Sequence, residues 1–159
     1  MIKQMNTLLR VKQLKEQQAF RLVNTKRAQV AEATRELEAA RERVAESAAT
    51  LPAREAAIWA EIMRRIIDLG EIEMTKGRVL ALEREHGKLV DAVERAAHVL
   101  ARLENELKEA VAAHRLTIKN RDKYVILTDE MKAEAAAAVD HREESEVEDL
   151  FSTRRKKSA

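Results

Sequence analysis

The sequence predicts an all-α protein that folds as one long antiparallel two-helix coiled-coil hairpin. Three observations carry this prediction: the composition, two rows of apolar residues at heptad spacing, and a pair of glycines between the rows. Of the 159 residues, 36% are charged and 3% are aromatic, with three Gly, one Pro and no Cys. This composition is typical of long helices and leaves too few large apolar side chains for a multilayer core. We therefore expect a single elongated domain over residues 1–159.

The first arm is predicted over residues 3–69. A row of apolar side chains recurs there every seven residues: Val23, Val30, Leu37, Val44, Leu51 and Ile58. A strict seven-residue repeat keeps one side of a helix against one partner helix. Pro52 lacks an N–H and its ring crowds the carbonyl of Ala48, so it predicts a kink or a brief restart within this arm.

The second arm is predicted over residues 78–150, after a tip loop at 70–77 that contains Gly70 and Gly77. Its apolar row has alternating spacings of three and four residues: Val79, Leu82, His86, Leu89, Val93, Ala96, Leu100, Leu103, Leu107 and Ala110. The repeat fixes the pairing of the arms only to within multiples of seven residues, and we use the two glycines to choose among these registers. With the glycines level, Ser47 faces Leu100 and Ile58 faces Leu89.

The tip carries more apolar residues than one partner helix covers. Trp59, Met63 and Ile67 form a second stripe beside Ile62 and Ile66. Two interpretations stay open: a protein-binding surface, or a surface that the tip loop folds back to cover.

The C-terminal end holds an acidic block, EESEVEDLF, and a basic tail at 151–159 that we expect to be frayed. In the chosen register the second arm overhangs the first from Val147 onward. The acidic block then lies near a basic N-terminal stretch, where the two segments either clasp each other or contact a charged partner. The formal net charge of +2 and the lack of aromatic residues beside RRKK argue against nucleic-acid binding.

No catalytic, cofactor or metal motif is recognisable, so we expect a protein that is not an enzyme and binds no cofactor. The histidines lack metal-ligand spacing, and His86 and His114 fall on the seam row, where packing is their expected role. No apolar run approaches the roughly 20 residues of a membrane span, and charges interrupt the N-terminus too often for a signal peptide. We therefore expect no membrane insertion.

Three stretches of this sequence resemble the YscO family of bacterial type III secretion proteins, which is similar to the flagellar export protein FliJ and to the γ stalk of rotary ATP synthases. They are MIKQMNTLLRVKQLKEQQAFR at the start, LGEIEMTKGRVLALEREHGKLVDAVERA in the middle, and KNRDKYVILTDEMKAEAAAAVDHREESEVEDLF near the end. The resemblance implies a virulence-associated, cytoplasmic protein, peripheral to the inner membrane at the base of the secretion apparatus. It implies a central stalk that couples the hexameric secretion ATPase to the cytoplasmic ring of the export gate and also handles secretion chaperones.

By region, the resemblance places ATPase contacts near the open end, at Leu9, Arg10, Lys12, Lys15, Phe20, Lys123 and Tyr124. It places export-gate contacts at the tip, at Trp59, Ile62, Met63, Ile66 and Ile67. For such a stalk we expect a monomer in isolation. The alternative is a self-associating structural coiled-coil adaptor whose arms pair between chains.

Overall fold

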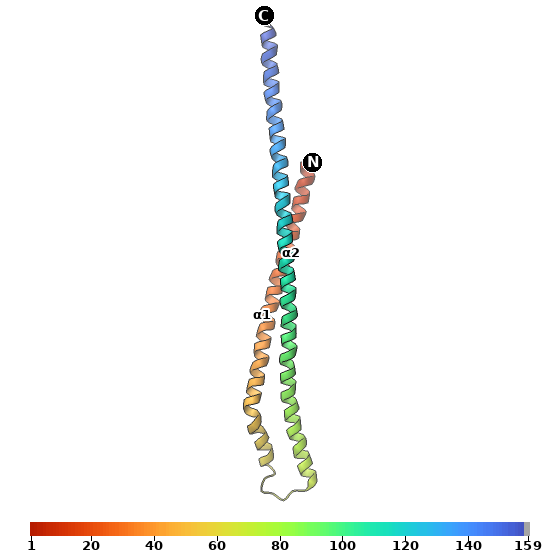
Figure 1. Ribbon diagram of the computed structural model, residues 1–159, viewed down its shortest axis with the longest axis vertical. Helices are drawn as coiled ribbons and strands as arrows, with labels where there is room; N and C mark the ends of the chain where they lie inside the picture. Colours follow the sequence, from red (N-terminus) through yellow and green to blue (C-terminus); the bar gives the residue numbers. More distant parts are fainter. Residues whose placement is uncertain (158–159) are drawn as a thin grey trace. The chain divides into compact units, whose positions relative to one another are not determined.

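The computed structural model describes residues 1–157 and consists of two helices joined by a short turn. Helix α1 spans Ile2–Ala60, 59 residues, and helix α2 spans Leu69–Lys157, 89 residues (Figure 1). The helices pack against each other, and the described part of the chain has no strand. The predicted all-α helical hairpin is therefore confirmed. None of the described helices is long and apolar enough to cross a membrane.

The chain divides into two compact units. Unit 1 combines Met1–Val23 with Ala110–Ala159, and unit 2 comprises Asn24–Glu109. In each unit, a stretch of α1 packs against a stretch of α2 that runs in the opposite direction.

The core of unit 2 is a narrow seam of small side chains. Ala33, Leu37 and Ala40 are buried on α1, together with Ser47, and Thr75 is buried on α2. The larger seam residues are only half-buried, because a second helix covers just one side of each helix. Heptad spacing thus predicted the inner face of α1 correctly at Leu37. The buried Ala33 and Ala40 lie four and three residues from Leu37, on the same side of the helix.

The predicted register of unit 2 is wrong by two heptads. Nδ1 of His86 lies 2.8 Å from Oγ of Ser47, whereas the glycine-based register paired Ser47 with Leu100. Lys26 also reaches across the seam and donates to Glu106 at 2.9 Å. A shift by whole heptads preserves every seam position, so the apolar repeat is equally satisfied by both registers.

The turn lies at residues 61–68, so the predicted loop at 70–77 and the predicted arm boundaries at 69 and 78 are wrong. Gly70 and Gly77 lie inside α2 with ordinary helical backbone angles. Asp68 begins α2 as its N-cap, since its Oδ1 accepts the backbone N–H of Glu71 at 2.8 Å. Arg64 has a positive φ of 62°, so the chain reverses at a non-glycine residue.

Pro52 lies inside α1, which continues unbroken from Ile2–Ala60. Its side chain is exposed, so the ring does not occupy the seam. The predicted interruption of the first arm therefore does not end the helix. The missing N–H of Pro52 leaves the carbonyl of Ala48 without its helical donor, and the preceding turn carries a side-chain hydrogen bond in which Thr50 Oγ1 donates to the carbonyl of Glu46 at 3.0 Å.

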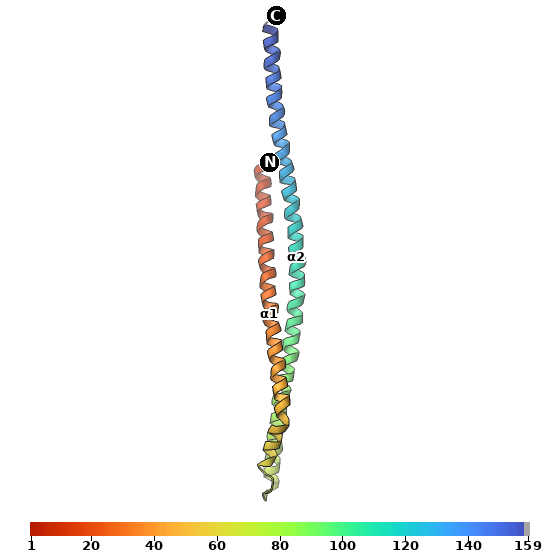
Figure 2. The same ribbon diagram turned by 90° about the vertical axis from the view of Figure 1, so that its left-hand side faces the viewer.

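In unit 1, α2 runs well beyond the start of α1 (Figure 2). Val23, Ala110 and Thr128 are the buried seam residues of this unit. Every residue from 136 to 156 is exposed, so the overhang begins earlier than the predicted Val147. The acidic block therefore does not clasp the basic N-terminal stretch. The basic tail, predicted to be frayed, continues α2 through Lys157, and the last two residues lie outside the described ones.

Candidate binding surfaces

The N-terminal part of unit 1 brings together a cation and an aromatic ring that the sequence analysis assigned to one site. Nζ of Lys12 on α1 lies 5.1 Å from the ring centre of Tyr124 on α2. At this distance a lysine is attracted by the face of the ring. Both side chains are half-buried, whereas Arg10, Lys15 and Lys123 are exposed.

A polar network that the sequence analysis missed lies beside this pair. Nε2 of His114 on α2 lies 2.9 Å from Oε1 of Glu16 on α1, and Nη1 of Arg121 approaches the other carboxylate oxygen at 3.6 Å. The ring of Phe20 lies 5.6 Å from the ring of His114. The signal for this network was a histidine on the seam row, which needs a polar partner, but the wrong register concealed Glu16 as that partner.

The seven residues predicted to contact an ATPase all belong to unit 1, and we name this set the basic-aromatic surface: Leu9, Arg10, Lys12, Lys15, Phe20, Lys123 and Tyr124. Leu9 is half-buried and Phe20 is 48% exposed. The structure thus gathers these residues in one unit. Whether they bind a partner stays a prediction.

The turn of unit 2 carries the second predicted surface, which we name the tip surface. Met63 is 67% exposed and Ile66 is fully exposed, whereas Trp59, Ile62 and Ile67 are half-buried. The turn therefore covers part of the apolar surplus and leaves part of it open. Leu69 and Met74, at the start of α2, add exposed apolar area that the predicted site did not include.

Ion pairs border the tip surface. Arg78 donates to Glu61 at 2.5 Å, and this hydrogen bond lowers the pKa of the Glu61 carboxyl and raises the pKa of the Arg78 guanidinium. Arg65 lies 3.8 Å from Glu71 on the other side of the turn. An apolar patch with a charged border is typical of a protein-binding surface.

A polar layer interrupts the seam of unit 2. Arg54 donates from Nη2 to Oγ of Ser47 at 3.1 Å, and Ser47 also contacts His86. Nε of Arg54 is buried without a hydrogen-bond partner. A shallow surface groove lies beside this polar layer. Residues of both helices line it, including Arg43 and Glu85.

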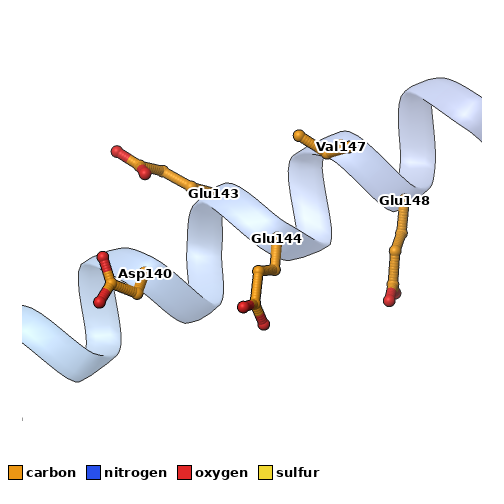
Figure 3. Close-up of a pocket in the computed structure, with 5 residues that line it drawn as sticks. All are labelled: Asp140, Glu143, Glu144, Val147 and Glu148. Atoms are coloured by element: carbon orange, nitrogen blue, oxygen red, sulfur yellow. The ribbon is translucent and has the colours of Figure 1, made fainter.

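The described residues contain no group of three His, Cys, Asp or Glu side chains that could hold a metal ion. A shallow acidic hollow on the overhang of α2 is lined by a single helix (Figure 3). Its residues are Asp140, Glu143, Glu144, Val147 and Glu148.

Comparisons with known proteins agree with this structure. The sequence matches the family profile described as "Type III secretion protein YscO" over residues 5–153. A crystal structure of the type III secretion protein YscO from Vibrio parahaemolyticus has a similar fold, with a TM-score of 0.87 and 22% sequence identity, covering 93% of each chain. A comparison with curated proteins gives no significant match.

Proposed function

Because the chain belongs to the YscO family of type III secretion proteins, we propose that it is a non-enzymatic stalk that couples a hexameric secretion ATPase to the export gate. The family match over residues 5–153 is the observation that carries this proposal. A protein in this role works at the cytoplasmic base of the secretion apparatus, peripheral to the inner membrane. Contacts with secretion chaperones belong to the same proposal.

The distribution of the two candidate surfaces supports a two-partner role. The basic-aromatic surface belongs to unit 1 and contains three exposed cations as well as the half-buried pair of Lys12 and Tyr124, which suits an acidic protein surface. The tip surface belongs to unit 2 and offers exposed apolar side chains, which suit an apolar pocket on a second partner. A pair of helices is about 20 Å across, which suits insertion into the pore of a ring-shaped ATPase.

The alternative is a structural coiled coil whose arms pair between chains. That hypothesis rested on the thinness of the predicted seam within one chain, and the observed seam is also thin. In the structure, α1 and α2 of the same chain pack against each other, and their polar groups find partners across that seam at Ser47 and Glu16. We therefore favour the stalk.

The proposal predicts that the two surfaces fail separately. Replacing Met63 and Ile66 by glutamate places two charges on exposed tip positions, and we expect at least a roughly tenfold loss of affinity for the gate ring with normal ATPase stimulation. Replacing Arg10 and Lys15 by glutamate should reduce ATPase stimulation and leave gate binding unchanged. Titration calorimetry with the gate ring and a phosphate-release assay with the cognate ATPase measure the two effects.

Matched controls exclude unfolding as the cause of either effect. Leu80→Glu changes an exposed apolar residue of unit 2 away from the turn, and Arg41→Glu changes an exposed cation there. Both controls should retain both activities, and circular dichroism should show equal helicity for all variants. Loss of both activities in each surface variant would overturn the assignment of two separate partners.

A further inference from the structure

The overhang of α2 is a helix without a partner in its own chain. From residue 136 to 156 every side chain is exposed, and α1 begins too far along the hairpin to cover this stretch (Figures 1 and 2). An isolated helix in water is marginally stable, because packing supplies most of the stability of helices in proteins. A partner on this segment would therefore stabilise it.

The seam does not continue into the overhang. Positions that follow Thr128 at alternating intervals of three and four residues are first apolar and then small or polar: Met131, Ala135, Ala138, Arg142, Ser145 and Asp149. Beyond Ala138, a helix that simply extended the path of α1 would find no apolar side chains at these positions. The apolar residues of the overhang lie on another side.

A different face of the overhang has the spacing of a helix-pairing surface, and we name it the overhang face. Each of its residues lies three or four positions from another member of the face: Asp140, Glu143, Glu144, Val147, Leu150, Phe151 and Arg154. At about 100° per residue, these positions lie within roughly 60° on either side of Val147. Figure 3 shows five side chains of this region, of which Glu148 borders the face, on a bare stretch of α2.

The overhang face changes character along its length. It begins with three carboxylates, continues with three apolar side chains that are 50–68% exposed, and ends with the arginine. Two copies of this face have complementary charges only when the two helices run antiparallel. A parallel copy would place carboxylates against carboxylates, whereas an antiparallel copy places the acidic end of each helix against the basic end of the other.

We propose that the overhang face docks antiparallel against the same face of a second copy of this chain. With Val147 of one copy level with Phe151 of the other, Glu144 is level with Arg154 of the other copy. The apolar centres then cover each other, and two equivalent ion pairs close the ends. This inference does not depend on the proposed function.

The association is expected to be weak and reversible. Three apolar side chains per copy cover far less than the roughly 1,200 Å² of a stable complex, which places the dissociation constant on the order of 100 µM. The dimer should therefore form in concentrated protein and dissociate on dilution, leaving the overhang face open to other partners.

Sedimentation equilibrium of the full chain tests the proposal. Between about 10 µM and 1 mM protein, the apparent mass should rise from the 18.1 kDa of one chain toward twice that value. Phe151→Ala should weaken dimerisation roughly tenfold, because it removes the largest apolar contact at the centre. Val139→Ala is the matched control, since Val139 is 51% exposed on the same overhang but lies outside the overhang face.

A charge exchange tests the antiparallel geometry. Glu144→Arg alone and Arg154→Glu alone should each weaken dimerisation several-fold, because each places like charges level with one another. The double variant carries the opposite pairs and should restore the dissociation constant to within about threefold of the original. In a parallel dimer the double variant would show no such recovery.

Three results would overturn the proposal. One is an apparent mass that stays at the monomer value up to about 1 mM. Another is a dimer whose dissociation constant is unchanged by Phe151→Ala and by the single charge reversals, since that dimer would use another surface. A loss of dimerisation by Val139→Ala equal to that by Phe151→Ala would also contradict it, as both losses would then reflect unfolding of the overhang.

Discussion

At the scale of single residues, polar side chains in the seams favour one register of the two helices, whereas the apolar repeat allows several. Ser47 contacts His86 in unit 2, and Glu16 contacts His114 in unit 1. Each pair satisfies groups that would otherwise lose water on packing, and leaving such a group unpaired costs about 1–3 kcal/mol. A heptad repeat of apolar residues alone does not favour one register over another that differs by seven residues.

The Lys26–Glu106 pair makes the free energy of unfolding depend on pH. Its hydrogen bond from Lys26 lowers the pKa of the Glu106 carboxyl below the model-compound value of 4.5. The unfolded chain therefore binds a proton more readily than the folded chain. The pair contributes its full stability above pH 4.5, and this contribution is lost as the pH falls through the lowered pKa of the folded state.

Glu106→Gln should therefore lower the Tm at neutral pH, and the difference from the original protein should shrink as the pH falls below 4.5. Thermal unfolding followed by circular dichroism between about pH 3 and pH 7 measures this difference. Glu104→Gln is the matched control on an exposed neighbouring position. A difference that is constant with pH would contradict an ionic contribution from Glu106.

At the scale of the helices, the sequence predicts two antiparallel helices but leaves their register ambiguous. The apolar rows at Leu37 and Val93 define which sides pack, because a helix keeps one face inward for every heptad. The register could not follow from them, since a slide of seven residues exchanges one apolar layer for another. The polar pair of Ser47 and His86 distinguishes the registers, because a slide by two heptads leaves Ser47 against Leu100.

The position of the turn was predictable from the helix-start signal at Asp68, but the prediction relied on the glycines instead. Asp68 followed three residues later by Glu71 is typical of a helix start, and the structure confirms Asp68 as the N-cap of α2. The reversal at Arg64 was not predictable, because a positive φ at arginine is uncommon and depends on the packing around it. Gly77 meets nothing within 4 Å where its Cβ would lie, so neither space nor backbone angle requires glycine there.

Disulfide trapping distinguishes the two registers of unit 2, and the chain has no cysteine of its own to interfere. The register of Ser47 and His86 places Leu51 level with Leu82, whereas the glycine-based register places it level with Ala96. We expect a variant with cysteines at 51 and 82 to oxidise readily within one chain. A variant with cysteines at 51 and 96 should stay reduced under the same conditions. The reverse result would refute the register seen here.

At the scale of the whole molecule, the buried residues are few and gathered in the seams, whereas the overhang has none. The packed residues around Leu37 and Ala40 anchor unit 2, and Thr128 is buried in unit 1. Local opening is easiest where backbone groups lack tertiary cover. Local stability should therefore be highest in the packed seams and lowest in the overhang.

Hydrogen–deuterium exchange should show this gradient. Amides between residues 136 and 156 should exchange at least about 100-fold faster than amides near Leu37, because the overhang opens without breaking any seam contact. Peptide-resolved mass spectrometry in dilute protein measures the rates. Equal protection in both segments would show that the overhang is covered in solution.

The candidate surfaces were partly predictable. The apolar surplus around Met63 follows from the helix faces that the sequence defines, whereas the contact between Lys12 and Tyr124 depends on the register, which had set Tyr124 opposite Val23. The network of Glu16, His114 and Arg121 was missed, because it depends on the register. The overhang face was missed in part, since a predicted overhang from Val147 onward left out its acidic residues Asp140, Glu143 and Glu144.

The thin seam of unit 2 has a consequence for how such a chain evolves. Each helix devotes about two positions in every seven to its neighbour, and substitutions elsewhere on an exposed helix typically change stability by less than about 0.5 kcal/mol. Most of the surface can therefore drift while the fold persists, as Glu85 or Arg43 could be replaced without touching Leu37. Lineages of such chains are free to change partners rapidly, and their descendants should keep a common architecture long after their sequences have ceased to look alike.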